Sequence, residues 1–357
     1  RMHLPTQKFS KEISIDKGLF LDIANFIRQN QLVSGAIPSN EDLSHDPWDH
    51  IESIMGLNFL EDKDSSEKAF NWLKENQNED GSWYAKYDDI SPIEYHKPTH
   101  FAPYIAVAAL HYYKIFKDKE KIKELWPTIQ SSINFSLKIQ NANGTIPWSI
   151  DKKGKIENDF LLSGSSSILK SIECGIALSK ILNFEVNKNW LTAYNRLSSA
   201  IRNPKGLFDI TIDRSRFSMD SYYPILSGCL TEPEKEVYIE KIFKEFYIEG
   251  LGVKCVREEP WITVAETCEF IIALTMSGNI TKAKKILIEV LNISDKKNIP
   301  FMGWQFEENF FWPNEKPTWT SAALIIAADS IYDFSDGSDI FTRNPVSYTH
   351  LRAHETR

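Results

Sequence analysis

Two glutamates lie one helical turn apart in a stretch that otherwise holds apolar or small residues. Glu266 and Glu269 fall within residues 262–275, and a spacing of three places both carboxylates on one face of a helix. Two anions on a buried face cannot both ionise at low cost, so one pKa should rise, which suits a general acid. The alternative is a hydrogen-bonded pair that ties neighbouring helices together. Glu258 and Glu259 are expected to be solvated in the preceding loop.

A second acidic group begins near residue 46. Asp46, followed by Pro47, has the form of a helix N-cap, and Asp49 would lie in the first turn, where an acid favours the helix dipole. Both therefore have a structural explanation. Glu52 shares a helical face with Asp49 but lies deeper in an apolar helix, where an unpaired carboxylate would be costly. Together with His50, Asp49 and Glu52 form the second set of candidate catalytic residues.

Aromatic and polar side chains gather near the same predicted helix starts. Lone histidines are more often structural than ligands, and no HxxxH or HExxH spacing occurs. We therefore expect no metal site and no cofactor. The tryptophans could be packing wedges, or they could offer flat surfaces to a sugar or a carbocation. The candidate substrate-binding residues are Trp48, Trp83, His100, Tyr104, Asp220, Tyr222, Trp261, Trp304 and Trp319.

Amphipathic and wholly apolar helical segments alternate along residues 19–333, six of each kind. The amphipathic segments would form an outer layer and the apolar ones an inner layer. The first outer and last inner helices would each leave a bare apolar face unless they pack together. The sequence therefore predicts an all-α (α/α)6 toroid of six helical hairpins, closed by packing the N-terminal helix on the C-terminal one, with few strands. All six inner helices should then begin at one mouth, where their dipoles favour negative charge.

The helical pattern also sets the expected domain limits. Residues 1–16 are predicted to be an N-terminal extension, 17–334 the toroid, and 335–357 an unstructured tail. Residues 343–357 have no helical or strand period, and they resemble a translated sequencing-adapter scar. They are therefore left out of fold reasoning.

Charge and composition restrict the partners. A net charge of −8 without a basic run argues against nucleic acid. No apolar run approaches the ~18 residues of a membrane span, and no signal peptide is recognised. The four cysteines lack CxxC or paired spacing and are predicted to be buried, reduced thiols of a cytoplasmic protein. They are Cys174, Cys229, Cys255 and Cys268.

The stretch Gln77-Asn78-Glu79-Asp80-Gly81-Ser82-Trp83 resembles the QxxDGSW repeat of the prenyltransferase and squalene-cyclase superfamily of α/α toroids. A partial copy spans residues 140–148. Residues 46–52, 250–261 and 263–269 are similar to an uncharacterised bacterial family usually labelled prenyltransferase-like. The resemblance implies the toroid fold and an enzyme acting on an isoprenoid-type substrate by acid catalysis in an aromatic-lined cavity.

Three functions remain open on these observations. The isoprenoid enzyme is the first, although the sequence lacks the DxDD-type motif of terpene cyclases and the zinc-ligand pattern of protein prenyltransferases. The first alternative is a six-hairpin glycoside hydrolase, which needs only two carboxyl groups across a sugar ring. The second is a non-catalytic toroid that binds a glycan or a protein at the same mouth. An enzyme is favoured, and neither its substrate nor its oligomeric state follows from the sequence.

Overall fold

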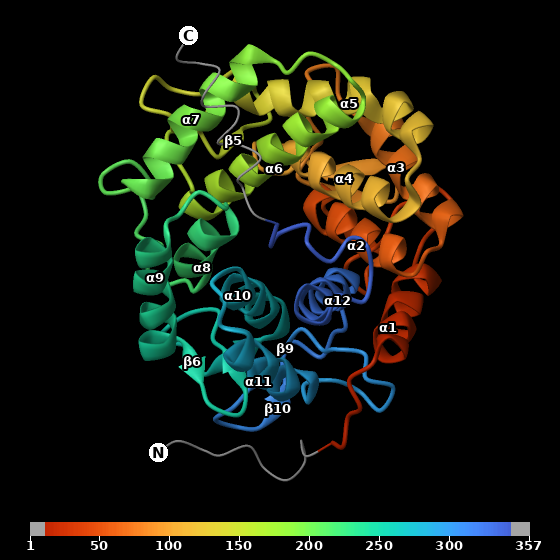
Figure 1. The fold of residues 1–357 in the computed structure, drawn as a ribbon, viewed down its shortest axis with the longest axis vertical. Helices are drawn as coiled ribbons and strands as arrows, with labels where there is room; N and C mark the ends of the chain where they lie inside the picture. The colour runs from red at the N-terminus through yellow and green to blue at the C-terminus, as the bar shows by residue number, and fades with distance from the viewer. Residues whose placement is uncertain (1–10, 344–357) are drawn as a thin grey trace.

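The computed structural model describes residues 11–343, which form a closed ring of helices (Figure 1). Each inner helix packs on the next inner helix around the ring, and the last, α12, packs on the first, α2. The N-terminal helix α1 packs on both of them, so the predicted all-α toroid and its closure are confirmed. The inner helices are α2 (Pro47–Phe59), α4 (Ile105–Phe116), α6 (Leu162–Ile181), α8 (Met219–Leu226), α10 (Val264–Met276) and α12 (Thr318–Tyr332). The outer helices are α1 (Lys17–Gln29), α3 (Lys63–Asn76), α5 (Lys119–Leu137), α7 (Lys188–Arg202), α9 (Glu232–Glu245) and α11 (Ile280–Leu291).

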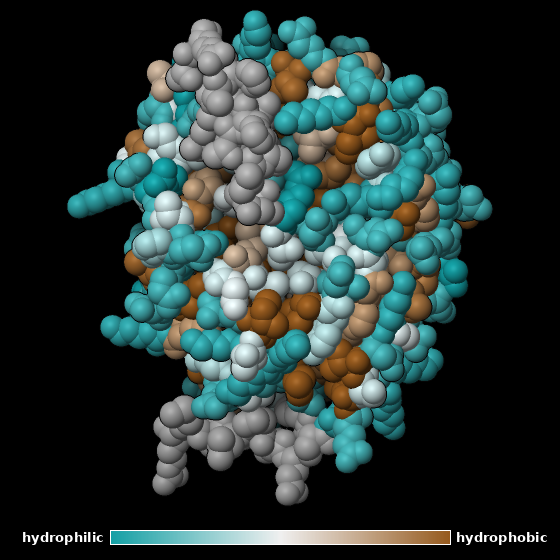
Figure 2. Space-filling view, viewed as in Figure 1, coloured by the Kyte–Doolittle hydropathy of each residue, from teal (hydrophilic) through white to brown (hydrophobic). Residues whose placement is uncertain are grey.

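The two layers differ in how much of each helix is buried. Outer helix α7 buries a single stripe that includes Trp190, Leu197 and Ile201. Inner helix α12 instead buries every residue from Thr318 to Asp329 except Trp319. A helix that is apolar on all sides is stable only when other helices surround it. The face of the molecule shown in Figure 2 is mainly hydrophilic, with separate hydrophobic groups among the polar ones.

The glutamine of the QxxDGSW-like turn joins successive outer helices. Gln77 Nε2 donates to Gly81 O at 3.0 Å and to Thr128 O on α5 at 2.9 Å. Gly81 has φ +93°, and a Cβ there would lie 2.1 Å from Ser131 O, so only glycine allows this close approach. Gln31 and Gln140 make the same two kinds of bond to their own turns and to the next outer helix. The repeat therefore helps to set how the first four outer helices, α1, α3, α5 and α7, pack on one another.

The connections that lead from an outer to an inner helix carry four small antiparallel sheets, so the expected strand content is confirmed as slight. Further contacts complete a linked rim, such as Arg214 with Asp159 at 2.9 Å and Thr318 Oγ1 donating to Pro38 O at 2.8 Å. The sheets are β1 (Ser44–His45) with β2 (Lys86–Asp88) and β3 (Ser91–Glu94); β4 (Lys97–Pro98) with β5 (Ser149–Ile150); β6 (Tyr247–Ile248) with β7 (Gly252–Val253); and β8 (Trp261–Thr263) with β9 (Gly303–Gln305) and β10 (Phe310–Phe311).

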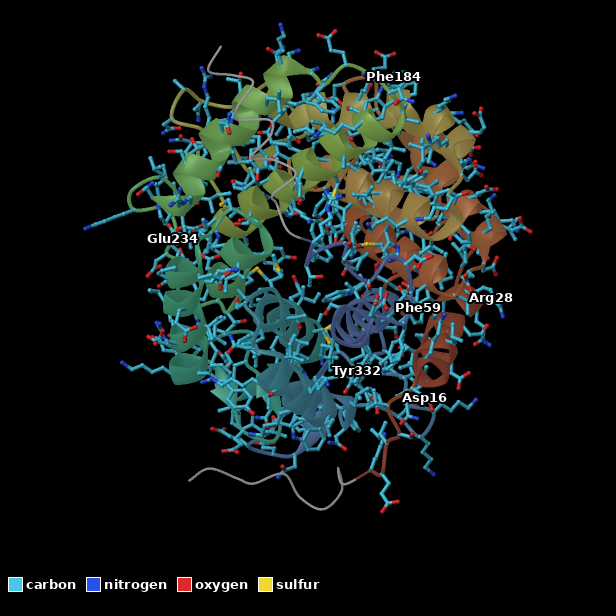
Figure 3. All side chains as sticks on the ribbon, in the orientation of Figure 1. Asp16, Arg28, Phe59, Phe184, Glu234 and Tyr332 are labelled. Carbon is cyan, nitrogen blue, oxygen red and sulfur yellow. The ribbon has the colours of Figure 1, made fainter. Side chains whose placement is uncertain are left out.

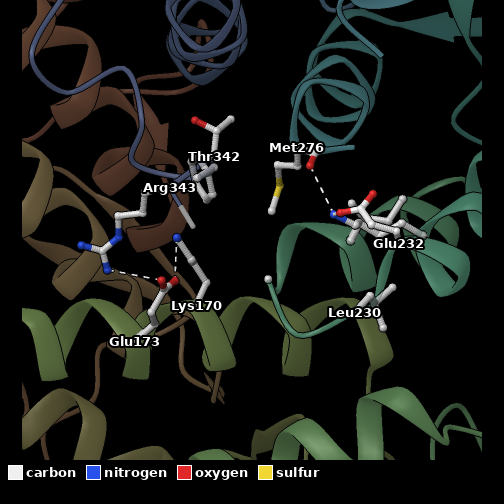
Figure 4. A pocket seen from close by; sticks show the side chains of 11 residues that line it. Lys170, Glu173, Leu230, Glu232, Met276, Thr342 and Arg343 are labelled. Carbon is white, nitrogen blue, oxygen red and sulfur yellow. Dashed lines mark hydrogen bonds and ion pairs between the residues drawn. The ribbon is translucent and has the colours of Figure 1, made fainter. Parts of the chain in front are cut away.

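Residues 335–343 differ from the unstructured tail expected there. The segment after α12 turns back across the ring (Figure 1) and buries Ile340 and Phe341. Arg343 lies 3.3 Å from Glu173, which also pairs with Lys170 at 2.6 Å (Figure 4). Apolar burial and the Arg343–Glu173 ion pair fix the segment although it has no helix or strand. The proposed scar lies outside the described residues, apart from Arg343.

Other sequence expectations have mixed outcomes. The first described residues of the expected extension contact the body, since Lys11 Nζ donates to Ser294 O at 3.0 Å. All four cysteines are unpaired, but only Cys174 and Cys268 are buried. Among residues 11–343, no helix is long and apolar enough to cross a membrane.

We predict that residues 335–343 stabilise the ring. A chain that ends at Phe334 should melt several degrees below one that ends at Arg343, because burying Ile340 and Phe341 contributes about 1.5–3 kcal/mol each. Thermal denaturation of the two truncated chains measures the difference. Equal melting temperatures would show that the segment adds nothing to stability.

Candidate active site

All six inner helices begin around one pocket of about 190 Å³, as the connectivity predicts. Because the inner helices point their N-termini at this mouth, their dipoles favour negative charge there. The residues lining the pocket include four carboxylic acids and neither lysine nor arginine. They are Asp46, Trp48, Asp49, His100, Phe101, Ser163, Gly164, Ser167, Met219, Tyr223, Glu266, Glu269 and Trp319.

One wall carries two aspartates from the start of α2. Asp46 is the N-cap, as expected, and its Oδ1 accepts a hydrogen bond from Asp49 N at 2.7 Å. It also lines the pocket, which the N-cap interpretation alone does not require. Burial raises the pKa of Asp46 to about 6. Burial, and then the negative charge of Asp46, raise the pKa of Asp49 well above its usual range. Asp49 is therefore the member of the pair that retains a proton.

A second wall carries two glutamates from α10. Glu266 lies in the first turn; its Oε1 accepts from Cys255 Sγ at 3.7 Å and its Oε2 has no hydrogen-bond partner. Burial raises the pKa of Glu266. Burial and the charge of Glu266 raise the pKa of Glu269 well above its usual range, and Tyr222 donates to Glu269 at 3.3 Å. Glu266 thus has the less strongly raised pKa of the two and a free oxygen.

Aromatic rings and a fifth carboxyl group form the floor. The Trp48 ring stacks on Tyr104, with 3.6 Å between centroids and 9° between planes. The Tyr104 hydroxyl donates to Glu52, whose pKa burial raises to about 7. Glu52, Tyr104 and Glu269 line one small cavity beneath the mouth pocket. The structure therefore brings both predicted acidic pairs, Asp49 with Glu52 and Glu266 with Glu269, to the mouth pocket and the cavity beneath it.

His50 does not face the pocket. Its Nδ1 accepts from Ile37 N at 3.2 Å, and its Nε2 is 2.9 Å from Ala69 O. Burial lowers its pKa to about 4, so the ring is neutral. Because backbone groups engage both ring nitrogens, His50 holds the connection between α1 and α2 in place. We therefore do not retain it as a catalytic candidate.

Several predicted binding residues also lie away from the pocket. Trp83 is fully buried and donates to Leu73 O at 3.0 Å, and Trp304 is buried beneath β10 with its ring against Phe311. Trp261 is the first residue of β8, and its ring packs against Trp312. The large flat surfaces that suggested binding are used here in packing.

Two further predicted residues belong to supporting layers. Tyr222 is buried behind Glu269, so it reaches the pocket only through that carboxyl group. Asp220 lies outside the pocket lining; burial and the neighbouring Asp209 raise its pKa to about 9. Of the predicted binding set, Trp48, His100 and Trp319 line the pocket and Tyr104 lines its floor.

Sequence reasoning set Asp46 aside as a cap and missed five lining residues, which are Phe101, Ser163, Gly164, Ser167 and Met219. Each lies at or near the start of an inner helix, which is the shared signal that could have identified them. Serine, methionine and phenylalanine carry no chemical signature of a site, so only their place in the ring reveals them.

A larger cavity of about 310 Å³ lies at the other end of the ring (Figure 4). It is lined by Glu173, which pairs with both Lys170 and Arg343, and by apolar groups such as Met276. None of the four mouth carboxyl groups reaches it. We therefore place the candidate active site at the mouth.

The Glu52 carboxyl group should make stability depend on pH. Its pKa of about 7 exceeds the usual 4.5, so the folded protein binds its proton more tightly than the unfolded chain. This contribution is present below pH 4.5 and is lost as the pH rises through 7, about 3 kcal/mol at most. Glu52→Gln should remove that loss, so its melting temperature should rise relative to the parent between pH 5 and 8. Exposed Glu75→Gln is the control, and parallel curves for all three proteins would contradict the assignment.

The comparisons with known proteins concern the whole ring. No protein-family model matches the chain. It is 32% identical over 318 residues to the MMP endo-(1,4)-3-O-methyl-alpha-D-mannosidase of Mycolicibacterium hassiacum, covering 89% of this chain and 87% of the relative.

Solved structures with the same fold include a wild-type glycosidase, at 12% identity and TM-score 0.66, over 89% of this chain and 99% of that one. The GH63 mannosylglycerate hydrolase of Thermus thermophilus matches at 11% identity and TM-score 0.66, over 86% and 99%. An alpha-amylase from Clostridium perfringens matches at 15% and 0.64, over 88% and 98%. At these identities the structural matches establish the fold alone.

Proposed function

The chain belongs to the glycoside hydrolase family of the Mycolicibacterium hassiacum endo-mannosidase, and from this premise we propose that it hydrolyses α-mannosidic linkages within a glycan. The relative's name specifies (1,4)-linked 3-O-methyl-mannose, and we propose the same class of substrate here. The observation that carries the proposal is the presence of acidic pairs from α2 and α10 in one pocket without a lysine or arginine.

The isoprenoid function expected from the resemblance is wrong, because the homologue is a mannosidase and the glycoside hydrolase alternative fits it. The protein is an enzyme, so the non-catalytic alternative is also set aside. The QxxDGSW-like turn reflects the α/α-toroid fold, which is shared with the prenyltransferase superfamily. Its glutamine and glycine pack outer helices and touch no pocket residue.

We assign the general acid to Asp49 and the general base to Glu266. Asp49, with its strongly raised pKa, would give its proton to the glycosidic oxygen as the bond to the anomeric carbon breaks. Glu266, whose pKa is raised less than that of Glu269 and whose Oε2 is free, would take a proton from the attacking water. In the ring, α12 packs between α2 and α10, so the two carboxyl groups enter the pocket from different walls, and we propose an inverting reaction in which a water lies between them.

Neutralising either proposed catalytic group should abolish turnover without unfolding the ring. Asp49→Asn and Glu266→Gln should each lower kcat by about 10²–10⁴-fold on (1→4)-linked 3-O-methyl-α-mannose oligosaccharides, with melting temperatures near the parent's. Glu259→Gln, on the exposed connection before α10, is the matched control. Full activity in either pocket variant would rule out the role given to that residue.

Asp46 should tune Asp49 rather than react. Asn caps a helix as well as Asp does, so Asp46→Asn keeps the cap and removes the charge that raises the pKa of Asp49. The alkaline limb of the kcat/KM profile should therefore move to lower pH, with the maximum rate reduced less than tenfold. An unmoved limb would contradict the coupling, and a rate loss like that of Asp49→Asn would make Asp46 a reacting group.

A further inference from the structure

Exposed apolar side chains are concentrated at the mouth end of the ring. Among residues 11–343, fourteen large hydrophobic side chains are exposed, and ten of them lie on connections that lead from an outer to an inner helix. Such a concentration marks a binding surface more often than single scattered residues do. The ten are Val33, Leu43, Ile90, Ile93, Tyr95, Ile156, Ile210, Ile212, Phe310 and Trp312.

Trp312 is the largest of these side chains, and its surroundings hold it firmly while leaving it 50% exposed. Its ring meets Trp261 edge to face, with 5.0 Å between centroids and 75° between planes. Trp261 Nε1 donates to Trp312 O at 2.6 Å, and Trp312 N donates to Gly303 O at 3.0 Å. A Cβ on Gly303 would lie 2.4 Å from the Trp261 ring nitrogen, so the glycine lets that indole pack directly on the backbone.

The platform, which we define as Trp312 with Trp261, connects to two of the helices that line the active-site pocket, α10 and α12. Strand β8 begins at Trp261 and ends where α10 starts, three residues before Glu266. Six residues beyond Trp312, α12 begins with Thr318, and the next residue, Trp319, lines the pocket. Trp312 itself is not among the lining residues. The platform therefore lies outside the site of bond cleavage but is anchored to the elements that form it.

We propose that Trp312 forms a remote subsite that stacks against a further sugar of the glycan, favouring an O-methylated sugar. The inference rests on the proposed function and deepens it. An indole offers a flat apolar face, and a methyl ether replaces a hydrated hydroxyl of the sugar with an apolar group. A chain that is cleaved internally must continue past the pocket, and the exposed Trp312 ring would offer it an apolar surface there. The subsite would then favour long, methylated chains over short or unmethylated ones.

The subsite contributes binding that is the same in the ground and transition states, so its loss should appear in KM rather than kcat. Trp312→Ala should raise KM for long 3-O-methyl-α-(1→4)-mannose oligosaccharides about three- to tenfold and leave the shortest cleaved oligosaccharide unaffected. The KM of Trp312→Phe, which keeps a flat ring, should lie between those of the parent and Trp312→Ala for the long oligosaccharides. The advantage of methylated over unmethylated long chains should shrink by a similar factor.

Phe184→Ala is the matched control, because Phe184 is also aromatic and 44% exposed. It lies on the connection between α6 and α7, away from the mouth, at the edge of the ring (Figure 3). Its KM values should equal the parent's for every chain length. Suppose that the parent cleaves the oligosaccharides. If the KM of Trp312→Ala then equals the parent's at every chain length, or rises equally for short and long substrates, the subsite is overturned while the proposed function stands. If the parent cleaves none of them, the proposed function fails and the subsite falls with it.

Discussion

Acidic groups held in a poorly hydrated mouth are the feature on which the proposed chemistry depends. Asp46, Asp49, Glu266 and Glu269 line one pocket, with Glu52 beneath them. Burial of carboxylates is costly, and no lysine or arginine lines the mouth pocket to offset it. The inner-helix N-termini offset part of that cost, and protonation relieves the rest. The same burial that disfavours ionisation keeps a proton available for transfer near neutral pH.

This mouth can exist only because six helix starts meet at one place. Ring closure brings α12 against α2 and thereby places the starts of α2 and α10 around one pocket. On the outside, the Gln77 turn and its two counterparts tie α1 to α3, α3 to α5 and α5 to α7. At the mouth, small sheets and contacts such as Arg214 with Asp159 link neighbouring connections. The packing of the ring thus positions side chains that are far apart in the sequence.

Helical periodicity was enough to predict the fold, because a helix that is apolar on all sides must be surrounded by other helices. The connectivity predicted that the inner helices begin at one mouth. This made the acidic pairs Asp49 with Glu52 and Glu266 with Glu269 candidates for the active site. The reaction did not follow, since the turn motif that carried the resemblance concerns packing. Trp83 and His50 were misplaced for a related reason: a tryptophan or histidine looks the same in sequence whether its polar atoms meet a ligand or the backbone. Residues 335–343 lack periodicity, so their burial could not be predicted.

The stereochemistry of hydrolysis tests the account most directly. Proton NMR of a (1→4)-linked 3-O-methyl-α-mannose oligosaccharide, recorded immediately after adding enzyme, reports the configuration of each new reducing end. An acid on α2 and a base on α10 with a water between them predict that the β-anomer appears first and then mutarotates. Immediate appearance of the α-anomer would contradict that arrangement, and an unchanged spectrum would contradict hydrolysis of this substrate altogether.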